Sequence, residues 1–471
     1  MAGPPIVFIL ADQLRCDVLG AYGDGQCPTP RLDDLARQST TFARHFTPCP
    51  QGQPARGSLM TGLAPRRHGA IINGWFRGER EYGTLNRGVA LLPGRLVDAG
   101  YAVVHGGVQV LRAAPDLFTQ LDRVEFIGPF APGDYQRQLE QRGLYLGDTA
   151  AFRVPIVDYH RGKPVVHRAT GTRTALFPLR EDLFFDCVVA QKIAEAVRAH
   201  DHSRPLALLA NFWLPHPPLW APQAYANLID PDDVQLKATV GRWSAGKPAL
   251  QLANVPGQLG AGISNEQWLD AWAMYMGMAA LLDKCVGDVF DALREARIWD
   301  DAIVIFTSTH CEMLGCHGLY QKMCLYEEAV RVPTFVKLPG QTQHRRVREL
   351  TDHLDLAATL IDFAEAEPLP GSPGMSLRRL AEGKAVAQPR THVFAAYDGN
   401  AGRGFAQRMV RTKTNKFIHN VADHGELYDL IDDPDETVNL IGREETASTE
   451  QEMRNLLNDW MDETGDDQPR C

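Results

Sequence analysis

Residues 6–12 read IVFILAD, a continuous apolar run that ends in a carboxylate. A strand that is apolar at every position fits the centre of a parallel sheet, because helices then cover both of its faces. Open α/β sheets bind their ligands at the carboxyl ends of their strands. The stretch therefore predicts an α/β fold with a ligand site close to Asp12.

Strands and helices alternate along the rest of the chain. Residues 29–39 (TPRLDDLARQS) predict a helix with Thr29 as N-cap and Pro30 as its first residue. The other expected elements are a strand–helix pairing over 89–107, helices over about 181–200 and 266–296, and strands over 205–213 and 301–309. This alternation predicts a doubly wound, mainly parallel sheet with helices on both sides.

Two segments interrupt this pattern and suggest a division into domains. The segment 113–174 is rich in Arg, Gly and Pro with weak periodicity, which predicts an irregular insertion. The PLPGSP stretch at 368–373 marks a boundary. We expect an α/β domain over 1–375 and a smaller C-terminal α+β domain over 376–471.

The composition excludes several classes of protein. The chain has 471 residues and a net charge of −10, without a dense stripe of Lys and Arg, which argues against nucleic acid or an anionic membrane as main partner. No apolar run approaches the roughly 18 residues that span a bilayer, and no signal-peptide pattern opens the chain. Nine Cys without a CxxC spacing indicate reduced thiols. We expect a cytoplasmic protein.

Five separated segments carry a family resemblance. They are ILADQLRCDVLGAYG (9–23), GQPARGSLMTG (52–62), FWLPHPPLWAP (212–222), FTSTHCEMLGCHGLYQKMCLYEEAVRVP (306–333) and ELYDLIDDPDETVNL (426–440). Their order and wording resemble the sulfatase branch of the alkaline phosphatase superfamily, above all phosphonate monoester hydrolases and bacterial sulfatases. The resemblance implies a hydrolase with an alkaline phosphatase-like fold, a small anionic substrate and one divalent metal ion.

The resemblance also implies which residues bind the metal. Asp12 and Gln13 match the first metal-binding pair, and His310 matches the second half of a late pair. Hard oxygen ligands of this kind suit Ca, Mg or Mn. Thr309 stands where the late pair has an Asp, and fewer carboxylates weaken the hold on a hard cation. We therefore expect metal binding to be weak or absent.

Four further positions match the catalytic pattern of the family. Arg56 matches the Arg of the (C/S)xPxR motif, Lys322 the Lys that reaches the leaving oxygen, and His216 the general acid. The family nucleophile, a Cys or Ser matured to formylglycine, falls on Gly52, which has no side chain. These positions predict an anion-binding pocket whose usual attacking group is missing.

A second group of departures follows the strand near residue 107. The family pattern expects a Gly-Lys-x-His stretch there, whereas this chain has Gly107, Val108, Gln109 and Val110. Val108 and Val110, which stand at the Lys and His positions of the pattern, are both apolar. The standard sulfatase mechanism cannot operate unchanged without these groups.

Two rescues of the chemistry stay open, and zinc is a separate alternative for the metal. Cys49, before the helix that starts near Gly52, could act as nucleophile because a helix N-terminus lowers a thiol pKa, and Ser58 is a weaker candidate. A metal-bound water could attack directly in the space left by Gly52. Zinc held by Cys311, Cys316 and His317 is a less favoured metal.

Two functions are therefore carried forward. The first is a sulfatase-like hydrolase that acts on a sulfate, phosphate or phosphonate ester by altered chemistry. The alternative is an inactive pseudo-sulfatase that binds an anionic ligand or a partner protein. The chain could also form a homo-oligomer.

Overall fold

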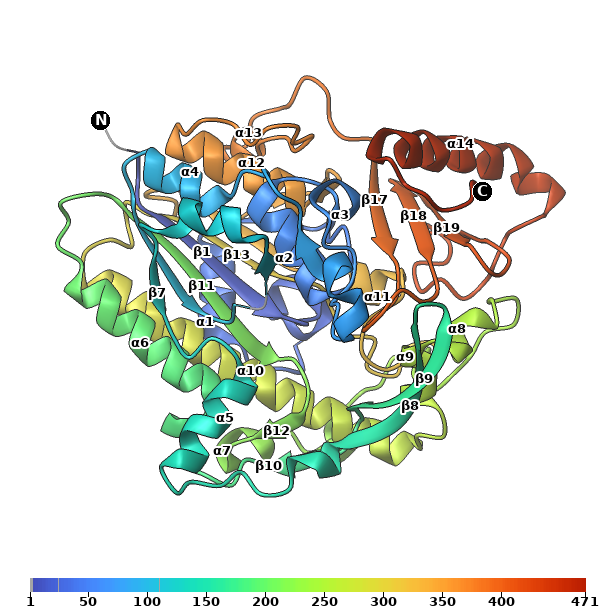
Figure 1. The fold of residues 1–471 in the computed structure, drawn as a ribbon, viewed down its shortest axis with the longest axis horizontal. Helices are drawn as coiled ribbons and strands as arrows, with labels where there is room; N and C mark the ends of the chain where they lie inside the picture. The colour runs from blue at the N-terminus through green and yellow to red at the C-terminus, as the bar shows by residue number, and fades with distance from the viewer. Residues whose placement is uncertain (1–2, 24, 110) are drawn as a thin grey trace.

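The computed structural model describes residues 3–23, 25–109 and 111–471, and Figure 1 shows its fold. The main sheet has eight strands in the order β15-β2-β14-β13-β1-β11-β5-β7. They are β1 (Ile6–Asp12), β2 (Thr40–Phe42), β5 (Ala102–Gly107), β7 (Glu125–Ile127), β11 (Leu206–Pro215), β13 (Ile303–Ser308), β14 (Thr334–Lys337) and β15 (Arg345–Val347). β1 lies in parallel between β11 and β13, while β14 is antiparallel to both of its neighbours. The predicted mainly parallel sheet is confirmed.

Helices cover both faces of this sheet, as Figure 1 shows. The helices are α1 (Pro30–Arg37), α6 (Phe185–Ala199) and α10 (Asn265–Glu295) on one face, and α2 (Gly52–Thr61), α4 (Leu92–Asp98) and α12 (His353–Ala364) on the other. Side chains of β1 alternate between two apolar clusters: Val7 and Ile9 join the first, and Ile6 and Phe8 the second. Burial of such a side chain stabilises a fold by about 1.5–3 kcal/mol. The predicted doubly wound architecture, with helices on both faces of the sheet, is confirmed.

The C-terminal part forms a second, antiparallel sheet. Its strands, in the order β17-β18-β19-β20, are β17 (His392–Tyr397), β18 (Gln407–Thr412), β19 (Asn415–Asn420) and β20 (Glu426–Asp429). Helix α14 (Ala447–Thr464) covers it and buries Leu457 and Met461 against Val410 and Phe417. The smaller α+β unit is confirmed. The boundary after residue 375 stays a prediction, and the short α13 (Arg378–Ala381) still contributes to the core of the main sheet.

The segment 113–174 is more regular than predicted. It contains β7, helix α5 (Pro132–Gln141) and a hairpin of β8 (Arg153–His160) and β9 (Lys163–Thr170). The hairpin turn, Arg161–Gly162, has φ values of 51° and 71°, as a two-residue turn with both residues in the left-handed region requires. The expectation of an irregular insertion is wrong because many side chains on both strands are exposed, so no alternation appears in the sequence.

The remaining elements are short. They are β3 (His45–Phe46), β4 (Thr84–Leu85), β6 (Arg112–Ala113), β10 (Thr174–Leu176), β12 (Leu219–Ala221), β16 (Thr351–Asp352), α3 (Pro65–His68), α7 (Gln223–Ala226), α8 (Leu250–Ala253), α9 (Val255–Gly260) and α11 (Glu327–Val330). In the part of the chain that the structure describes, no helix is both long enough and apolar enough to cross a membrane.

Candidate active site

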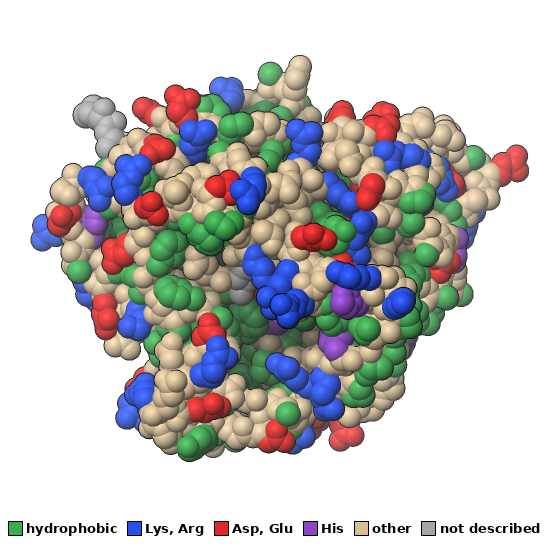
Figure 2. All heavy atoms as spheres, in the orientation of Figure 1, with side chains coloured by type: hydrophobic (Ala, Val, Ile, Leu, Met, Phe, Trp, Pro, Cys, Tyr) green, Lys and Arg blue, Asp and Glu red, His purple; other side chains and the backbone are tan. Residues whose placement is uncertain are grey.

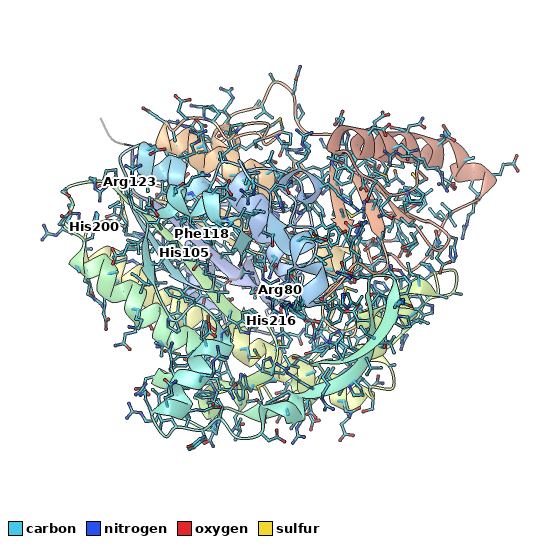
Figure 3. All side chains as sticks on the ribbon, viewed as in Figure 1. Arg80, His105, Phe118, Arg123, His200 and His216 are labelled. Atoms are coloured by element: carbon cyan, nitrogen blue, oxygen red, sulfur yellow. The ribbon has the colours of Figure 1, made fainter. Side chains whose placement is uncertain are left out.

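The carboxyl ends of three neighbouring strands bring the predicted site residues together. Asp12 ends β1, His216 follows β11, and His310 follows β13. Arg56 reaches the same place from α2, and Lys322 from the loop after β13. All five line one cavity of about 330 Å³. Figure 2 shows a hollow near the middle of this face with Lys and Arg side chains on its rim, and Figure 3 labels His216 there.

Gly52 is the first residue of α2 and lines this cavity, so the predicted helix start is confirmed. A Cβ atom placed on Gly52 would lie 3.0 Å from Nη1 of Arg56, closer than most such contacts. Arg56 therefore occupies part of the space that a nucleophile side chain would need.

Arg56 and Asp12 form a buried ion pair. Nη2 of Arg56 donates to Oδ2 of Asp12 at 3.2 Å, and the Thr309 hydroxyl donates to Oδ1 at 2.7 Å. Burial alone would raise the pKa of Asp12, but Arg56 and the neighbouring His and Lys residues outweigh it and hold the pKa well below its usual range. Asp12 is thus a carboxylate whose two oxygens both accept hydrogen bonds from this chain.

Two of the guanidinium nitrogens of Arg56 lack a hydrogen-bond acceptor within the described residues. Its Nε and Nη1 atoms are buried and make no hydrogen bond within the described residues. A buried donor without an acceptor costs about 1–3 kcal/mol. Because Arg56 lines the cavity, an anion bound there can accept from these donors.

Lys322 is held between two polar side chains. Its Nζ donates to Oε1 of Gln13 and to Nε2 of His216, the latter at 2.7 Å. Its neighbours Gln321 and Met323 have φ values of 70° and 72°, in the left-handed region that non-glycine residues rarely adopt. The backbone on both sides of Lys322 is therefore strained, and the lysine points into the site.

The proton between these groups lies on Lys322 at neutral pH. Burial lowers the pKa of Lys322 to about 8, against the attraction of Asp12 and Glu312. Burial and the Lys322 ammonium lower the pKa of His216 to about 3. Nδ1 of His216 donates to the Pro217 carbonyl at 2.7 Å, so its Nε2 is the acceptor of the lysine bond. The geometry favours Lys322, rather than His216, as proton donor.

His310 is an uncharged imidazole in the site. Its Nε2 lies 3.4 Å from Oδ1 of Asp12 and makes no hydrogen bond within the described residues. Burial and the nearby Lys322 hold the pKa of His310 well below its usual value. An uncharged imidazole that faces the cavity can accept a proton, and Asp12 would stabilise the resulting charge.

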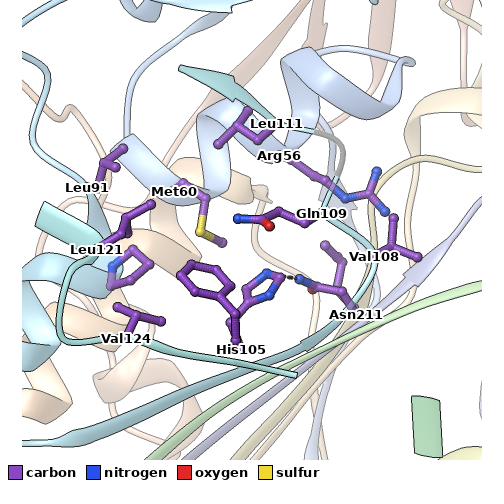
Figure 4. A pocket seen from close by; sticks show the side chains of 13 residues that line it. Arg56, Met60, Leu91, His105, Val108, Gln109, Leu111, Leu121, Val124 and Asn211 are labelled. Atoms are coloured by element: carbon purple, nitrogen blue, oxygen red, sulfur yellow. Dashed lines mark hydrogen bonds between the residues drawn. The ribbon is translucent and has the colours of Figure 1, made fainter. Parts of the chain in front are cut away.

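A second, mostly apolar cavity adjoins the first and shares Arg56, Gln109 and Leu111 with it. Figure 4 shows His105 of β5 beside Asn211 of β11, with 2.7 Å between His105 Nε2 and Asn211 Nδ2. Burial lowers the pKa of His105 to about 4. The sequence analysis missed both residues, although each is a polar residue within an apolar strand.

The stretch after β5 reaches the site as its place in the sequence predicts. Val108 lines the apolar cavity, and Gln109 lines both cavities. The second predicted apolar replacement, Val110, lies outside the described residues.

The two alternative nucleophiles are not placed for attack. Cys49 is fully buried, and burial together with Asp398 raises its pKa well above the usual value, so the expected low thiol pKa is wrong. The Ser58 hydroxyl contacts Nε2 of His68 at 3.1 Å inside α2. Neither residue lines the active-site cavity.

The cysteines after β13 have separate partners rather than a common centre. Sγ of Cys311 donates to the Leu14 carbonyl at 2.8 Å, whereas Cys316 lies 3.8 Å from Nη2 of Arg15. Burial raises the pKa of Cys316 to about 12. Within the described residues, no three His, Cys, Asp or Glu side chains converge as metal ligands. This geometry does not support a zinc site.

A doubly wound sheet with Asp12, His216 and His310 at its strand ends, and with Arg56 and Lys322 at the same cavity, is typical of an ester hydrolase of the alkaline phosphatase superfamily. The chain belongs to the sulfatase family, whose model, described as "Sulfatase", matches residues 4–366. Residues 315–463 match a second model, "N-sulphoglucosamine sulphohydrolase, C-terminal". The predicted family is confirmed.

Similar proteins agree with this assignment. An arylsulfatase of Clostridium perfringens is 27% identical over 96% of this chain and 93% of its own length. A choline-sulfatase of Rhizobium meliloti is 27% identical over 93% of this chain and 82% of its own. The crystal structure of a phosphonate monoester hydrolase of Agrobacterium radiobacter superposes with a TM-score of 0.82 at 23% identity, covering 98% and 96% of the two chains. These findings support an ester hydrolase of the sulfatase type.

Sulfatases generally depend on a divalent metal, so membership supports a metal ion in general. The side chains present do not fit a tightly held hard cation. Asp12 already accepts from Arg56 and Thr309. Gln13 is turned away, because its amide donates to Glu312 and accepts from Lys322. The role of Asp12, Gln13, Thr309 and His310 as ligands stays a prediction.

Proposed function

We propose that this chain hydrolyses a sulfate ester, or a related phosphate or phosphonate ester, by direct attack of water and without a covalent intermediate. The observation that supports this most strongly is the pair of unpartnered Arg56 nitrogens at a cavity that Lys322 also lines. Two fixed cations in a buried pocket bind an ester anion and stabilise the charge that develops as it reacts. The substrate is therefore a small anionic ester.

The residues have the following roles in this proposal. Arg56 binds the anion, and the absence of a side chain at Gly52 leaves room for a water beside it. His310 takes a proton from this water as its oxygen bonds to the sulfur or phosphorus atom. The bond to the ester oxygen breaks, and that oxygen takes a proton from Lys322. Transfer of a proton from His310 back to Lys322 through solvent restores the site.

The second candidate function is a binder that does not turn its ligand over. Gly52 and Thr309 favour it, because the nucleophile and a metal carboxylate of the family are both missing. The two functions differ in a simple assay with 4-nitrophenyl sulfate, 4-nitrophenyl phosphate and a 4-nitrophenyl phosphonate monoester. Release of nitrophenol supports the hydrolase. Thermal stabilisation by sulfate without any nitrophenol release supports the binder.

Hydrolysis should lose rate in alkali. The proton donor of the proposal is Lys322, whose pKa is about 8, so the active form is the protonated one present below that pH. We expect kcat/KM to be level between pH 6.5 and 7.5 and to fall about tenfold per pH unit above 8. The profile is measured from pH 6 to 10 with phenyl sulfate. A rate that rises through this range contradicts the assignment.

Restoring the family nucleophile should not by itself restore family activity. We expect Gly52→Cys, co-expressed with a formylglycine-generating enzyme, to remain at least tenfold less active than the double variant with Thr309→Asp. The new side chain meets Arg56 at 3.0 Å, and Thr309 supplies no carboxylate for a metal. Only the double variant should respond to added Ca, Mg or Mn. Full activity of the single variant contradicts this account of the metal site.

We also propose a cytoplasmic location. The nine cysteines are irregularly spaced and include no CxxC pattern, which suits a reducing compartment. Fractionation of the native host, with the chain detected by antibody, tests this point.

A further inference from the structure

A third cavity lies on the edge of the molecule where the main sheet meets the C-terminal sheet. It has a volume of about 230 Å³ and shares no lining residue with the active-site cavity. Five arginines line it, here called the arginine pocket: Arg44, Arg331, Arg346, Arg348 and Arg411. They come from the β2–β3 connection, the end of α11, β15 and its following loop, and β18.

The positive charge of the arginine pocket is largely uncompensated. Its single acidic lining residue is Glu327. Within the described residues, the only ion pair between this acid and a pocket arginine is the one with Arg411, at 3.5 Å, and the other four arginines make none with any acid. Five cations on one small cavity are notable in a chain whose net charge is −10. Burial and the neighbouring Arg411 lower the pKa of Arg44, as expected of crowded like charges.

Glu327 cannot neutralise this cluster, because it has another cation to satisfy. Its Oε1 lies 2.9 Å from Nζ of Lys416, a buried lysine that is also 2.9 Å from Glu436. The acid is therefore shared between a lysine behind the pocket and Arg411 at its wall.

The arginine pocket also contains a buried donor without an acceptor. The Nε atom of Arg331 is buried and makes no hydrogen bond within the described residues. The Nε atom of Arg411, a residue that is only 5% exposed, faces Oε1 of Glu327 at 3.5 Å, beyond normal hydrogen-bond distance. Native proteins satisfy nearly all buried donors, so the Arg331 donor favours an acceptor that is not part of the chain.

We propose that the arginine pocket binds a small anion that carries phosphate or sulfate groups. A planar guanidinium group can donate two parallel hydrogen bonds to two oxygens of one phosphate or sulfate group. The volume suits one or two such groups and is smaller than most sites for larger ligands. A bound anion joins Arg346 and Arg348 of the main sheet to Arg411 of the C-terminal sheet. The site is separate from the ester pocket and does not depend on the function proposed for that pocket.

The test uses inorganic pyrophosphate and isothermal titration. The parent for comparison is the double variant Asp12→Asn with Arg56→Met, which removes both charges of the buried pair and leaves the active-site pocket without its main anion ligand, so a failure of the proposed function does not affect the result. We expect the added pair Arg346→Gln and Arg348→Gln to weaken pyrophosphate binding at least tenfold. Both side chains are exposed, so folding should be retained. The matched control is Arg297→Gln, an exposed arginine outside the pocket.

Two outcomes overturn the proposal. One is equal pyrophosphate affinity in the pocket variant and the Arg297→Gln control. The other is the absence of measurable binding in the Asp12→Asn, Arg56→Met parent at low ionic strength. A further check uses the wild-type Arg56 chain, in which the Arg346→Gln and Arg348→Gln pair should reduce the pyrophosphate-induced rise in Tm while nitrophenyl sulfate hydrolysis stays unchanged.

Discussion

Replacing Lys322 with alanine is expected to lower kcat/KM for phenyl sulfate by about a thousandfold. Loss of one fixed hydrogen-bond donor to a developing charge typically lowers the rate by about 10²–10³-fold. Loss of a general acid typically lowers it by about 10²–10⁴-fold. The loss should be smaller for 4-nitrophenyl sulfate, because nitrophenolate leaves without a proton. Rates are compared for the two esters in the same preparation.

A matched control separates this effect from damage to the fold. Lys337 is a second buried lysine, at the opposite end of the sheet, where its Nζ donates to the Trp299 carbonyl at 3.1 Å. Lys337→Met should destabilise the chain without changing the ratio of the two esters. If Lys322→Ala slows both esters equally, Lys322 binds the anion but does not protonate the leaving oxygen.

Replacing Arg56 with methionine is expected to reduce kcat/KM about a thousandfold and to weaken stabilisation by sulfate. Arg56→Lys should recover little, because a point charge cannot replace two nitrogens of a planar fork. Arg56→Met also leaves Asp12 buried without its cation, which costs about 3–5 kcal/mol of stability. Activity, sulfate binding and Tm are measured on each variant.

The double variant Asp12→Asn with Arg56→Met distinguishes the two effects. It removes both charges of the pair, so Tm should recover much of the way toward the wild type. Activity should not recover, since the anion still lacks its ligand. Recovery of activity together with Tm means that Arg56 acts only through the fold.

The sequence analysis found the sheet because its central strand is apolar at every position. The alternation of Ile6 and Phe8 against Val7 and Ile9 between two cores follows from that run alone. The hairpin of β8 and β9 could not be found in the same way. Many of its side chains are exposed, and only Ile156 and Asp158 are buried on β8 and β9. Arg161 occupies a turn position where Asn or Asp is the usual signal.

The site was predictable as a set of positions but not as a set of contacts. Strand ends and family motifs placed Asp12, His216 and His310 together. The motifs could not show that Arg56 pairs with Asp12, or that Gln13 turns toward Glu312 and Lys322. Those contacts depend on side-chain directions in loops without regular structure. The protonation of Lys322 rather than His216 depends on burial, which the sequence does not show.

The left-handed backbone at Gln321 and Met323 has a consequence for engineering. Each such residue costs about 1–2 kcal/mol, and glycine at either position would relieve it. A thermostabilised version of this chain is therefore expected from Gln321→Gly, in exchange for a looser anchor of Lys322.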